Sequence, residues 1–334
     1  MIGLWDTTGN EVVRALAAER RSAGGVASGL ALSLIAVVEE KKVREAEAAA
    51  TIAAAAHPCR VLIVVRTDLD GRSRLDAEIV VGGRLGPAEA VVMRMYGRLA
   101  LHAESVVIPL LAPDVPVVTW WHSEPPDTIA NDFLGVVADR RITDCAQATD
   151  PVAALHRRAA DYAPGDTDLT WARITLWRTL MASAFDTTEA KVVGAKIVGP
   201  AKDPTAALMY GWLKARLGII SELESTDKYP RMRSVQLQCA NDECVTVTRE
   251  EGTALFSRTG HEDRYMPLPR RTVGDELAEE LRRLDADQVY SEALGALSGM
   301  EHLDLREPKR VHVWKDPAQA VRAGAVTGPG GYPA

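Results

Sequence analysis

Residues 60–65, Arg60-Val-Leu-Ile-Val-Val65, are the stretch on which the fold depends. Five consecutive aliphatic residues without alternation are typical of a strand that is buried on both of its faces. The alanine-rich segment 42–56 predicts a helix just before this strand, because alanine favours helix, and Pro58 ends that helix. Residues 30–38 predict a second buried strand ahead of the helix. The alternation of strands and helices predicts an α/β fold.

The rest of the chain continues this alternation. Thr8 and Glu11 fit a capping box, which satisfies the free amides at the start of a helix predicted over 11–21. Asp168 predicts the start of a longer helix, because apolar residues recur at helical spacing from Trp171 to Phe185. Further strands are expected at 75–81, 91–96, 116–121, 191–198, 235–239, 245–248, 253–257 and 310–314, and further helices at 99–111, from Asp203-Pro204 to Gly218, at 274–285 and at 287–298.

The length of the chain predicts two domains. The 334 residues are 47% hydrophobic, and chains of this size usually divide instead of growing one core. The turn-forming segment Ala163-Pro164-Gly165-Asp166 marks the expected boundary. We therefore expect two α/β domains, residues 1–163 and 164–318, each a mixed sheet flanked by helices. Residues 319–334 are expected to be a disordered tail.

The charge balance restricts the class of partner. The formal net charge is −7, and nucleic acid or an anionic membrane surface requires clustered positive charge, so neither is expected as a partner. The first residues do not resemble a secretory signal, and the apolar run 29–38 is too short to cross a bilayer. We expect a cytoplasmic protein, in which the four cysteines remain reduced.

Sequence motifs for catalysis and cofactor binding are missing. The segment Gly82-Gly83-Arg84-Leu85-Gly86 has the wrong spacing for a dinucleotide-binding loop and is predicted to be a turn. His122 and Glu124 resemble a fragment of a deaminase signature, but no second zinc-binding motif follows. The cysteines and histidines do not cluster at metal-ligand spacing, and no nucleophile motif occurs. We expect no catalytic residues, no metal and no cofactor.

Cys239 and Cys244 lie in a predicted hairpin, and the strand register decides whether they can pair. A two-residue turn would place the cysteines opposite each other but would align Val235 and Leu237 with threonines. A three-residue loop instead aligns Val235, Leu237 and Cys239 with valines on one buried face and sends the cysteines to opposite faces. A slip of one residue flips every side chain, so burial favours the second register. We expect no disulfide.

Four residues are candidates for binding a partner: Trp120, Trp121, Arg140 and Arg141. Tryptophan and arginine are enriched where protein interfaces concentrate their binding energy. The alternative is that helices of the same chain cover them. A second candidate site is an anion site at Thr205 and Ala206, because amides at a helix start bind phosphate. Arg270-Arg271 is expected to be solvated surface or, failing that, a contact for a single anion or an acidic patch.

Several motifs, taken in order, resemble a known family. They are Asp6-Thr-Thr8, His57-Pro-Cys-Arg60, Pro109-Leu-Leu-Ala-Pro-Asp114, Pro116-Val-Val-Thr-Trp-Trp121, Arg140-Arg-Ile-Thr-Asp144 and Asp168-Leu-Thr-Trp-Ala-Arg-Ile-Thr-Leu-Trp-Arg178. In this order and spacing the chain, up to about residue 315, resembles the OpcA family of glucose-6-phosphate dehydrogenase assembly proteins in its actinobacterial form.

The resemblance implies a non-catalytic protein that binds glucose-6-phosphate dehydrogenase, promotes its active state and supports NADPH production in the oxidative pentose phosphate pathway. The family has no catalytic residues to carry over. Cyanobacterial relatives are linked to redox control through cysteines, which have no matching positions here. An alternative from the residues themselves is a sugar-phosphate-binding sensor or enzyme that uses the helix start at 203–206 as its anion site.

Overall fold

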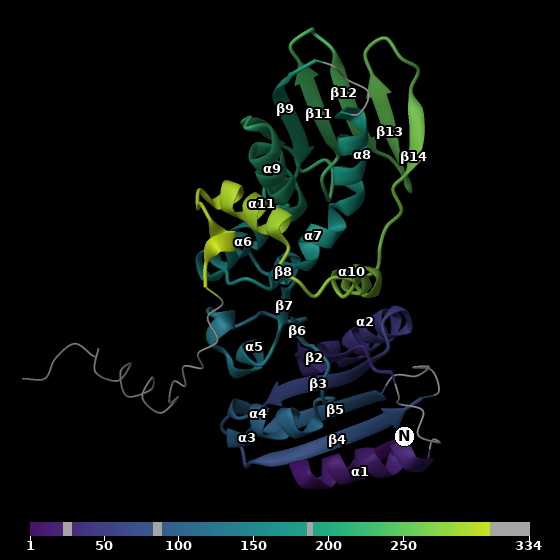
Figure 1. Ribbon diagram of the computed structural model, residues 1–334, viewed down its shortest axis with the longest axis vertical. Helices are drawn as coiled ribbons and strands as arrows, with labels where there is room; N and C mark the ends of the chain where they lie inside the picture. Colours follow the sequence, from purple (N-terminus) through teal and green to yellow (C-terminus); the bar gives the residue numbers. More distant parts are fainter. Residues whose placement is uncertain (23–28, 83–88, 186–189, 308–334) are drawn as a thin grey trace, which may run out of the picture.

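A computed structural model describes residues 1–22, 29–82, 89–185 and 190–307. The molecule is elongated, with one sheet near each end and a helical layer between them (Figure 1). The predicted α/β class with two mixed sheets flanked by helices is confirmed. The expected strand 310–314, the tail 319–334 and residues 83–86 of the predicted turn lie outside the described residues.

The first sheet has eight strands. In spatial order they are β1 (Ile2–Leu4), β4 (Arg74–Val81), β5 (Glu89–Tyr96), β3 (Cys59–Thr67), β2 (Leu32–Val38), β6 (Val117–Trp121), β7 (Arg140–Thr143) and β8 (Asp166–Asp168). From β5 to β8 all neighbours run parallel, whereas β4 and β1 are antiparallel to their neighbours. The parallel part follows the doubly wound order, in which the first strand, β2, lies between the second, β3, and the fourth, β6.

Both faces of the first sheet are covered. On one face Leu62 and Val64 of β3 pack with Val12 of α1 and with the short helices after β5. On the other face Val61 and Ile63 pack against the alanines of α2. The helices in this region are α1 (Gly9–Ser22), α2 (Val43–Ala56), α3 (Arg98–Leu101), α4 (Glu104–Val107), α5 (Phe133–Val136) and α6 (Pro151–Asp161), with 3-10 turns η1 (Glu40–Lys42), η3 (Ile108–Leu110), η4 (Ile129–Asn131) and η5 (Cys145–Gln147).

Two predicted helices are broken. The helix expected over 99–111 is divided into α3, α4 and η3, because His102 leaves the helical backbone region and Pro109 has no N–H to donate. The helix that Asp168 begins is divided at Ile174 into α7 (Leu169–Arg173) and α8 (Thr175–Phe185). The start itself is confirmed, because the Asp168 carboxylate accepts a hydrogen bond from the amide of Thr170.

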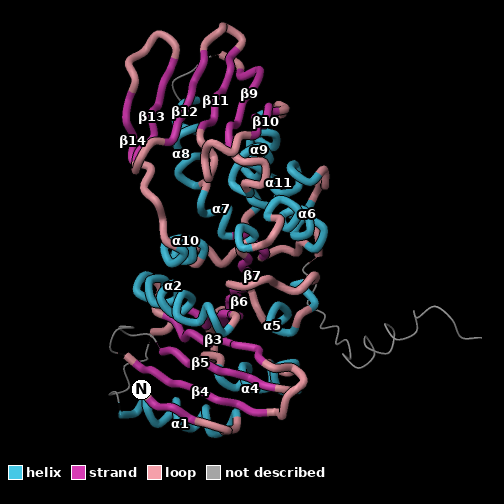
Figure 2. Tube along the Cα trace, turned by 180° about the vertical axis from the view of Figure 1, so that it is seen from behind, coloured by secondary structure: helices cyan, strands magenta, loops and turns pink. Residues whose placement is uncertain are grey.

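The second sheet has six strands. In spatial order they are β10 (Ser221–Ser225), β9 (Val192–Gly199), β11 (Ser234–Cys239), β12 (Cys244–Arg249), β13 (Thr253–Arg258) and β14 (Arg264–Pro267). One face packs against helices, including α9 (Pro204–Leu217) and α11 (Gln288–Ser298). The opposite face, in front in Figure 2, carries the half-buried Gln236, Thr246 and Ser257 in register with one another.

The register of the β11–β12 hairpin agrees with the burial argument. Val235 lies opposite Val247 and Leu237 opposite Val245, all on the buried face. Cys239 is buried, whereas Cys244 pairs with Gln238 on the open face, and both cysteines are free. The prediction that they form no disulfide is confirmed for this structure.

The two sheets share elements across the expected boundary at residue 163. The strand β8 follows that boundary but belongs to the first sheet, and α6 precedes it but packs into the core beside the second sheet. The helix α10 (Val273–Glu280) comes after the last strand of the second sheet and packs on α2 of the first (Figure 1). Gly274 allows this close approach, since a Cβ there would lie 2.7 Å from Cβ of Ile52.

Candidate functional site

Doubly wound sheets bind ligands at the carboxyl ends of their strands, where the strand order reverses. Here that point lies between β2 and β6, and the turn after β2 reads Glu39-Glu40-Lys41-Lys42 without a glycine. The amide of Glu39 donates to the hydroxyl of Ser123 at 2.9 Å, and Arg94 of β5 holds the carboxylate of Glu40 at 2.9 Å. This turn therefore presents two carboxylates where a dinucleotide-binding loop presents free amides.

Side chains of the chain itself bridge the same edge. The ammonium of Lys42 donates to Gln147, beyond β7, at 3.2 Å. His122, at the end of β6, is fully buried and stacks on Trp120 with ring centroids 4.9 Å apart. Burial lowers the pKa of His122, which favours its neutral form. The usual ligand edge is thus filled by protein groups.

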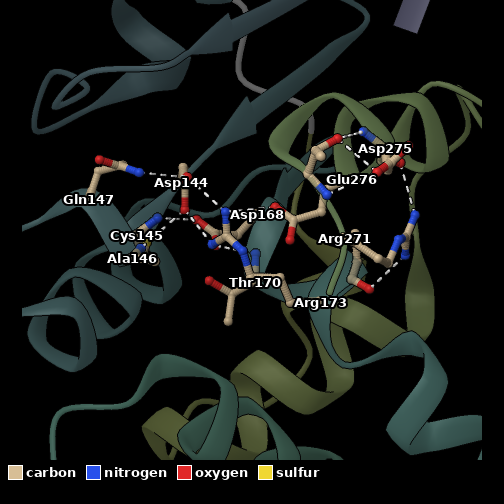
Figure 3. Close-up of polar contacts among 12 residues, drawn as sticks. Asp144, Cys145, Ala146, Gln147, Asp168, Thr170, Arg173, Arg271, Asp275 and Glu276 are labelled. Carbon is tan, nitrogen blue, oxygen red and sulfur yellow. Dashed lines mark hydrogen bonds and ion pairs between the residues drawn. The ribbon is translucent and has the colours of Figure 1, made fainter. Parts of the chain in front are cut away.

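A buried polar network begins at the end of the neighbouring strand β7. The guanidinium of Arg173 in α7 binds both carboxylate oxygens of Asp144, at 2.6 and 2.9 Å. It also lies 2.7 Å from the carboxylate of Glu276 in α10 (Figure 3). One guanidinium therefore joins three elements that are far apart in the sequence.

Two buried carboxylates, those of Asp144 and Glu276, share the half-buried guanidinium of Arg173. Burial, together with the charge of Asp144, raises the pKa of Glu276 to about 7, although Arg173 acts in the opposite direction. The carboxylate of Asp168 forms a separate set of hydrogen bonds beside the network around Arg173. It accepts from the hydroxyl of Thr143 at 2.7 Å and from the amides of Cys145 and Thr170 at 2.8 and 2.9 Å (Figure 3).

A pocket of about 460 Å³ adjoins this network, and we call it the basic pocket. It lies between α7, α8, the start of α9, the start of α10 and the segments before β11 and after β14. Its lining residues are Ala146, Arg173, Leu176, Trp177, Pro200, Lys202, Asp203, Pro204, Thr205, Pro230, Arg231, Arg249, Leu268, Pro269, Arg270, Arg271, Val273 and Glu276.

The cations of the basic pocket fall into two groups. Three have a carboxylate partner: Arg173 as described, Arg271 with Glu279, and Lys202 with Asp150 at 3.1 Å. The other three have no ion pair within the described part of the chain: Arg231, Arg249 and Arg270. Only two carboxylates, those of Asp203 and Glu276, line the pocket itself. Its electrostatic potential therefore favours anions.

The four residues predicted to bind a partner lie in the interior. Trp120, Trp121, Arg140 and Arg141 are each at most 2% exposed. Arg140 of β7 binds Glu280 at 2.7 Å and the carbonyl of Asp285, whereas Arg141 pairs with Asp166. As placed here, these side chains contact other parts of the same chain and offer no surface to a partner.

The predicted anion site lies partly in the basic pocket. Thr205 lines the pocket, but its amide already donates to the carboxylate of Asp203 at 2.8 Å, which caps α9. The side chain of Ala206 is buried. Sequence reasoning missed Arg231 and Arg249 because strand ends and turns bring them together from distant positions. Arg270 and Arg271, for which the sequence predicts solvated surface first and a contact for an anion or an acidic patch second, both line the pocket.

Two further negative observations apply to the described residues alone. No helix there is long and apolar enough to cross a membrane. No group of three or more His, Cys, Asp or Glu side chains there is placed to hold a metal ion.

The chain is similar to a curated protein and, more distantly, to solved structures. The protein from Synechococcus elongatus with the name OxPP cycle protein OpcA is 29% identical over 307 residues, which cover 74% of this chain and 68% of that protein. The crystal structure of an NAD binding oxidoreductase from Klebsiella pneumoniae has a TM-score of 0.41 at 11% identity and covers 81% of this chain and 96% of that one. Similarity at that level carries no argument about this chain.

Two family models match successive parts of the chain. The model for the N-terminal domain of glucose-6-phosphate dehydrogenase subunit matches residues 50–160, and the model for its C-terminal domain matches residues 164–294. Because both matches occur in order and together span most of the sequence, the chain belongs to the OpcA family of glucose-6-phosphate dehydrogenase subunits.

Proposed function

We propose that this chain is a non-catalytic assembly factor and allosteric activator of glucose-6-phosphate dehydrogenase in the cytosol. In this role it supports NADPH production by the oxidative pentose phosphate pathway. The observation that carries the proposal is the match to both domains of a dehydrogenase subunit family. The name of the cyanobacterial relative, which refers to the OxPP cycle, supports the same metabolic setting.

The first sheet supports a role other than dinucleotide chemistry. Its topology would allow a pyrophosphate to bind at the start of the helix after β2, where amides and glycines normally receive it. In this chain that turn contains no glycine, and the carboxylates of Glu39 and Glu40 are held by Lys41 and Arg94. Lys42 and Gln147 bridge the same edge. A chain with this edge filled is suited to act through its surface.

Activation by a partner has a simple thermodynamic requirement. A protein shifts its target toward the active state only if it binds that state more tightly than the inactive one. A tenfold shift requires a difference of about 1.4 kcal/mol in binding free energy. A few well-packed interface residues supply that much.

The test uses the full chain and the dehydrogenase from the same organism. We expect the two to co-elute in size-exclusion chromatography with light scattering, and we expect saturable activation of the dehydrogenase as the chain is added. The chain by itself should not reduce NADP⁺ with glucose 6-phosphate. An unrelated protein of similar size is the control for non-specific stabilisation. Absence of co-elution, or unchanged kinetics despite co-elution, would contradict the proposal.

A further inference from the structure

The three unpaired guanidiniums of the basic pocket lack a counter-charge. Arg231, Arg249 and Arg270 line one pocket of about 460 Å³, and no carboxylate of the described chain forms an ion pair with any of them. Arg140, by contrast, is buried and pairs with the carboxylate of Glu280 at 2.7 Å. Like charges that line one pocket repel one another, so a bound anion would be attracted by all three guanidiniums.

Arg249 is the clearest case. Its guanidinium is half-buried and lies over the ring of Trp177, 5.2 Å from the centroid. Its Nε donates to the carbonyl of Met232 at 3.2 Å, and its two terminal nitrogens have no hydrogen-bond partner among the residues that the structure describes. Burial lowers the pKa of Arg249 and the charge of Arg231 lowers it further, whereas the carboxylate of Asp203 acts in the opposite direction. The two lowering effects are those expected for a half-buried cation that lies near a second cation.

The remaining walls limit the kind of anion. Leu176, Trp177 and Leu268 provide apolar surface, and the prolines Pro200, Pro230 and Pro269 make the rim stiff. A pocket of this volume is in the range of small-molecule sites, which combine apolar walls with a few polar anchors. The indole N–H of Trp177, itself 1% exposed, has no hydrogen-bond acceptor among the described groups. A ligand with hydroxyl groups beside its anionic group would match these walls.

Two carboxylates in the lining act against an anion, and both are already engaged. Asp203 caps α9 through the amide of Thr205 and accepts from the amide of Met232. Glu276 lies against the guanidinium of Arg173. Neither forms an ion pair with Arg231, Arg249 or Arg270 within the described residues, although the charge of Asp203 acts on Arg249.

From this geometry we propose that the basic pocket binds a small phosphorylated organic anion, such as a sugar phosphate, through Arg231, Arg249 and Arg270. The site goes beyond the proposed function, because it belongs to the chain alone and does not require the dehydrogenase. It lies where α10, which packs on the first sheet, meets the start of α9 beside the second. A ligand held there contacts both parts of the molecule.

The test measures binding by the isolated full chain. Isothermal titration calorimetry and thermal shift would compare glucose 6-phosphate, ribose 5-phosphate, inorganic phosphate and sulfate at equal ionic strength, with glucose as the uncharged probe. We expect a sugar phosphate to bind and to raise the melting temperature as mass action requires. We expect sulfate and glucose to have little effect.

Three variants locate the site. Arg231→Gln and Arg270→Gln remove exposed guanidiniums, and Arg249→Gln removes the half-buried one. Each should weaken binding about tenfold or more, because hydrogen bonds to charged groups are among the strongest in proteins. Arg14→Gln is the matched control, since it removes one exposed positive charge from α1 at the other end of the molecule and should change affinity less than twofold (Figure 1).

Three outcomes would overturn the proposal. They are no binding of any sugar phosphate at millimolar concentration, equal effects of sulfate and sugar phosphate, or binding that none of the three pocket variants weakens. If the same variants instead abolish co-elution with the dehydrogenase while sugar phosphates fail to bind, an acidic segment of the partner occupies the pocket. That result would reject the small-molecule site and leave the proposed function standing.

Discussion

Arginine side chains occupy two different environments in this protein. Arg140, Arg141 and Arg173 are enclosed and each faces a carboxylate, whereas Arg231 and Arg249 share a pocket without an ion pair. The sequence does not distinguish these groups, because an arginine acquires its partner from positions that are far away in the chain. The first group stabilises the fold, and we propose that the second binds a ligand.

The ion pair of Arg140 and Glu280 should be structural. Arg140→Met removes the guanidinium that binds the buried carboxylate of Glu280. Among the hydrogen bonds of the described residues, that carboxylate then keeps the one from the hydroxyl of Thr167 at 2.9 Å. We expect a loss of about 3–5 kcal/mol in the free energy of unfolding, measured by urea denaturation. Adding Glu280→Gln should recover part of that loss. If Arg140→Met keeps its stability but no longer binds the dehydrogenase, Arg140 is a partner contact and not a structural residue.

Glu276 should make stability depend on pH. Its pKa of about 7 in the folded chain lies above the ordinary value of 4.5, so the folded state retains a proton that the unfolded state loses. The free energy of unfolding contributed by this group is therefore complete below pH 4.5 and declines as the pH rises toward 7. Glu276→Gln lacks this decline. Denaturation curves between pH 4.5 and 8 should show that the free energy of unfolding of the variant rises relative to that of the wild type as the pH increases.

Asp275, on the same helix, provides a control of opposite sign. Hydrogen bonds from the amide and hydroxyl of Thr272 lower the pKa of Asp275, so its contribution is present at neutral pH and is lost as the pH falls. Asp275→Asn should be less stable than the wild type at pH 7, with a difference that shrinks in acid. Parallel pH curves for the wild type and Glu276→Gln would show that Glu276 has an ordinary pKa.

At the scale of elements, local signals place the ends of helices and packing decides their continuity. The caps at Thr8, Asp168 and Asp203 act as their residue types predict, and Gly218 ends α9 in the left-handed region with φ of 65°. The periodic pattern starting at Asp168 nevertheless breaks at Ile174. Apolar spacing alone cannot show such a break, since both pieces pack into the same core.

Gly211 tests this balance within α9. Helix propensity predicts that Gly211→Ala stabilises an exposed helix by about 1 kcal/mol. Here α9 packs against α11, and a Cβ at Gly211 would clash with the carbonyl oxygen of Ala293. We expect the variant to lose about 1–3 kcal/mol instead. Ala215→Gly, on the exposed side of the same helix, should cost about 1 kcal/mol from propensity alone. Stabilisation by Gly211→Ala would contradict the close contact of the two helices.

At the scale of the whole molecule, the two sheets are joined by α10 and by the network around Arg173. The helix follows the second sheet in the sequence but buries Leu277 and Leu281 in the core of the first. Arg173 binds the carboxylates of Asp144, just after β7, and of Glu276 in α10. The parts on either side of residue 163 should therefore unfold together.

Leu277→Ala tests this coupling. The substitution leaves a cavity between α10 and α2, and large-to-small changes in a core cost about 2–5 kcal/mol. We expect a lower melting temperature by calorimetry and weaker amide protection in α2, which is more than 200 positions away in the chain. Leu305→Ala, at an exposed position, should change neither. Unchanged protection of α2 would show that the first sheet is stable without α10.

The sequence by itself determined many of the longer helices and strands, the α/β class and the hairpin register that separates Cys239 from Cys244. These features depend on residues that are near neighbours in the chain or on the alternation of faces along a strand. Both kinds of pattern can be read from the amino-acid sequence. The short polar strands β7 and β8 gave no such signal, because they have too few apolar residues to show a period.

Only the tertiary structure decided which charged and aromatic side chains are buried and which line a pocket. It enclosed Trp120, Trp121 and Arg140, which composition alone could equally place at an interface, and it gathered Arg231, Arg249 and Arg270 in one pocket. The physical reason is that burial and counter-charge are properties of a place in space. Residues far away in the chain set the environment of a guanidinium. Arg140, for example, pairs with Glu280, which lies 140 residues later.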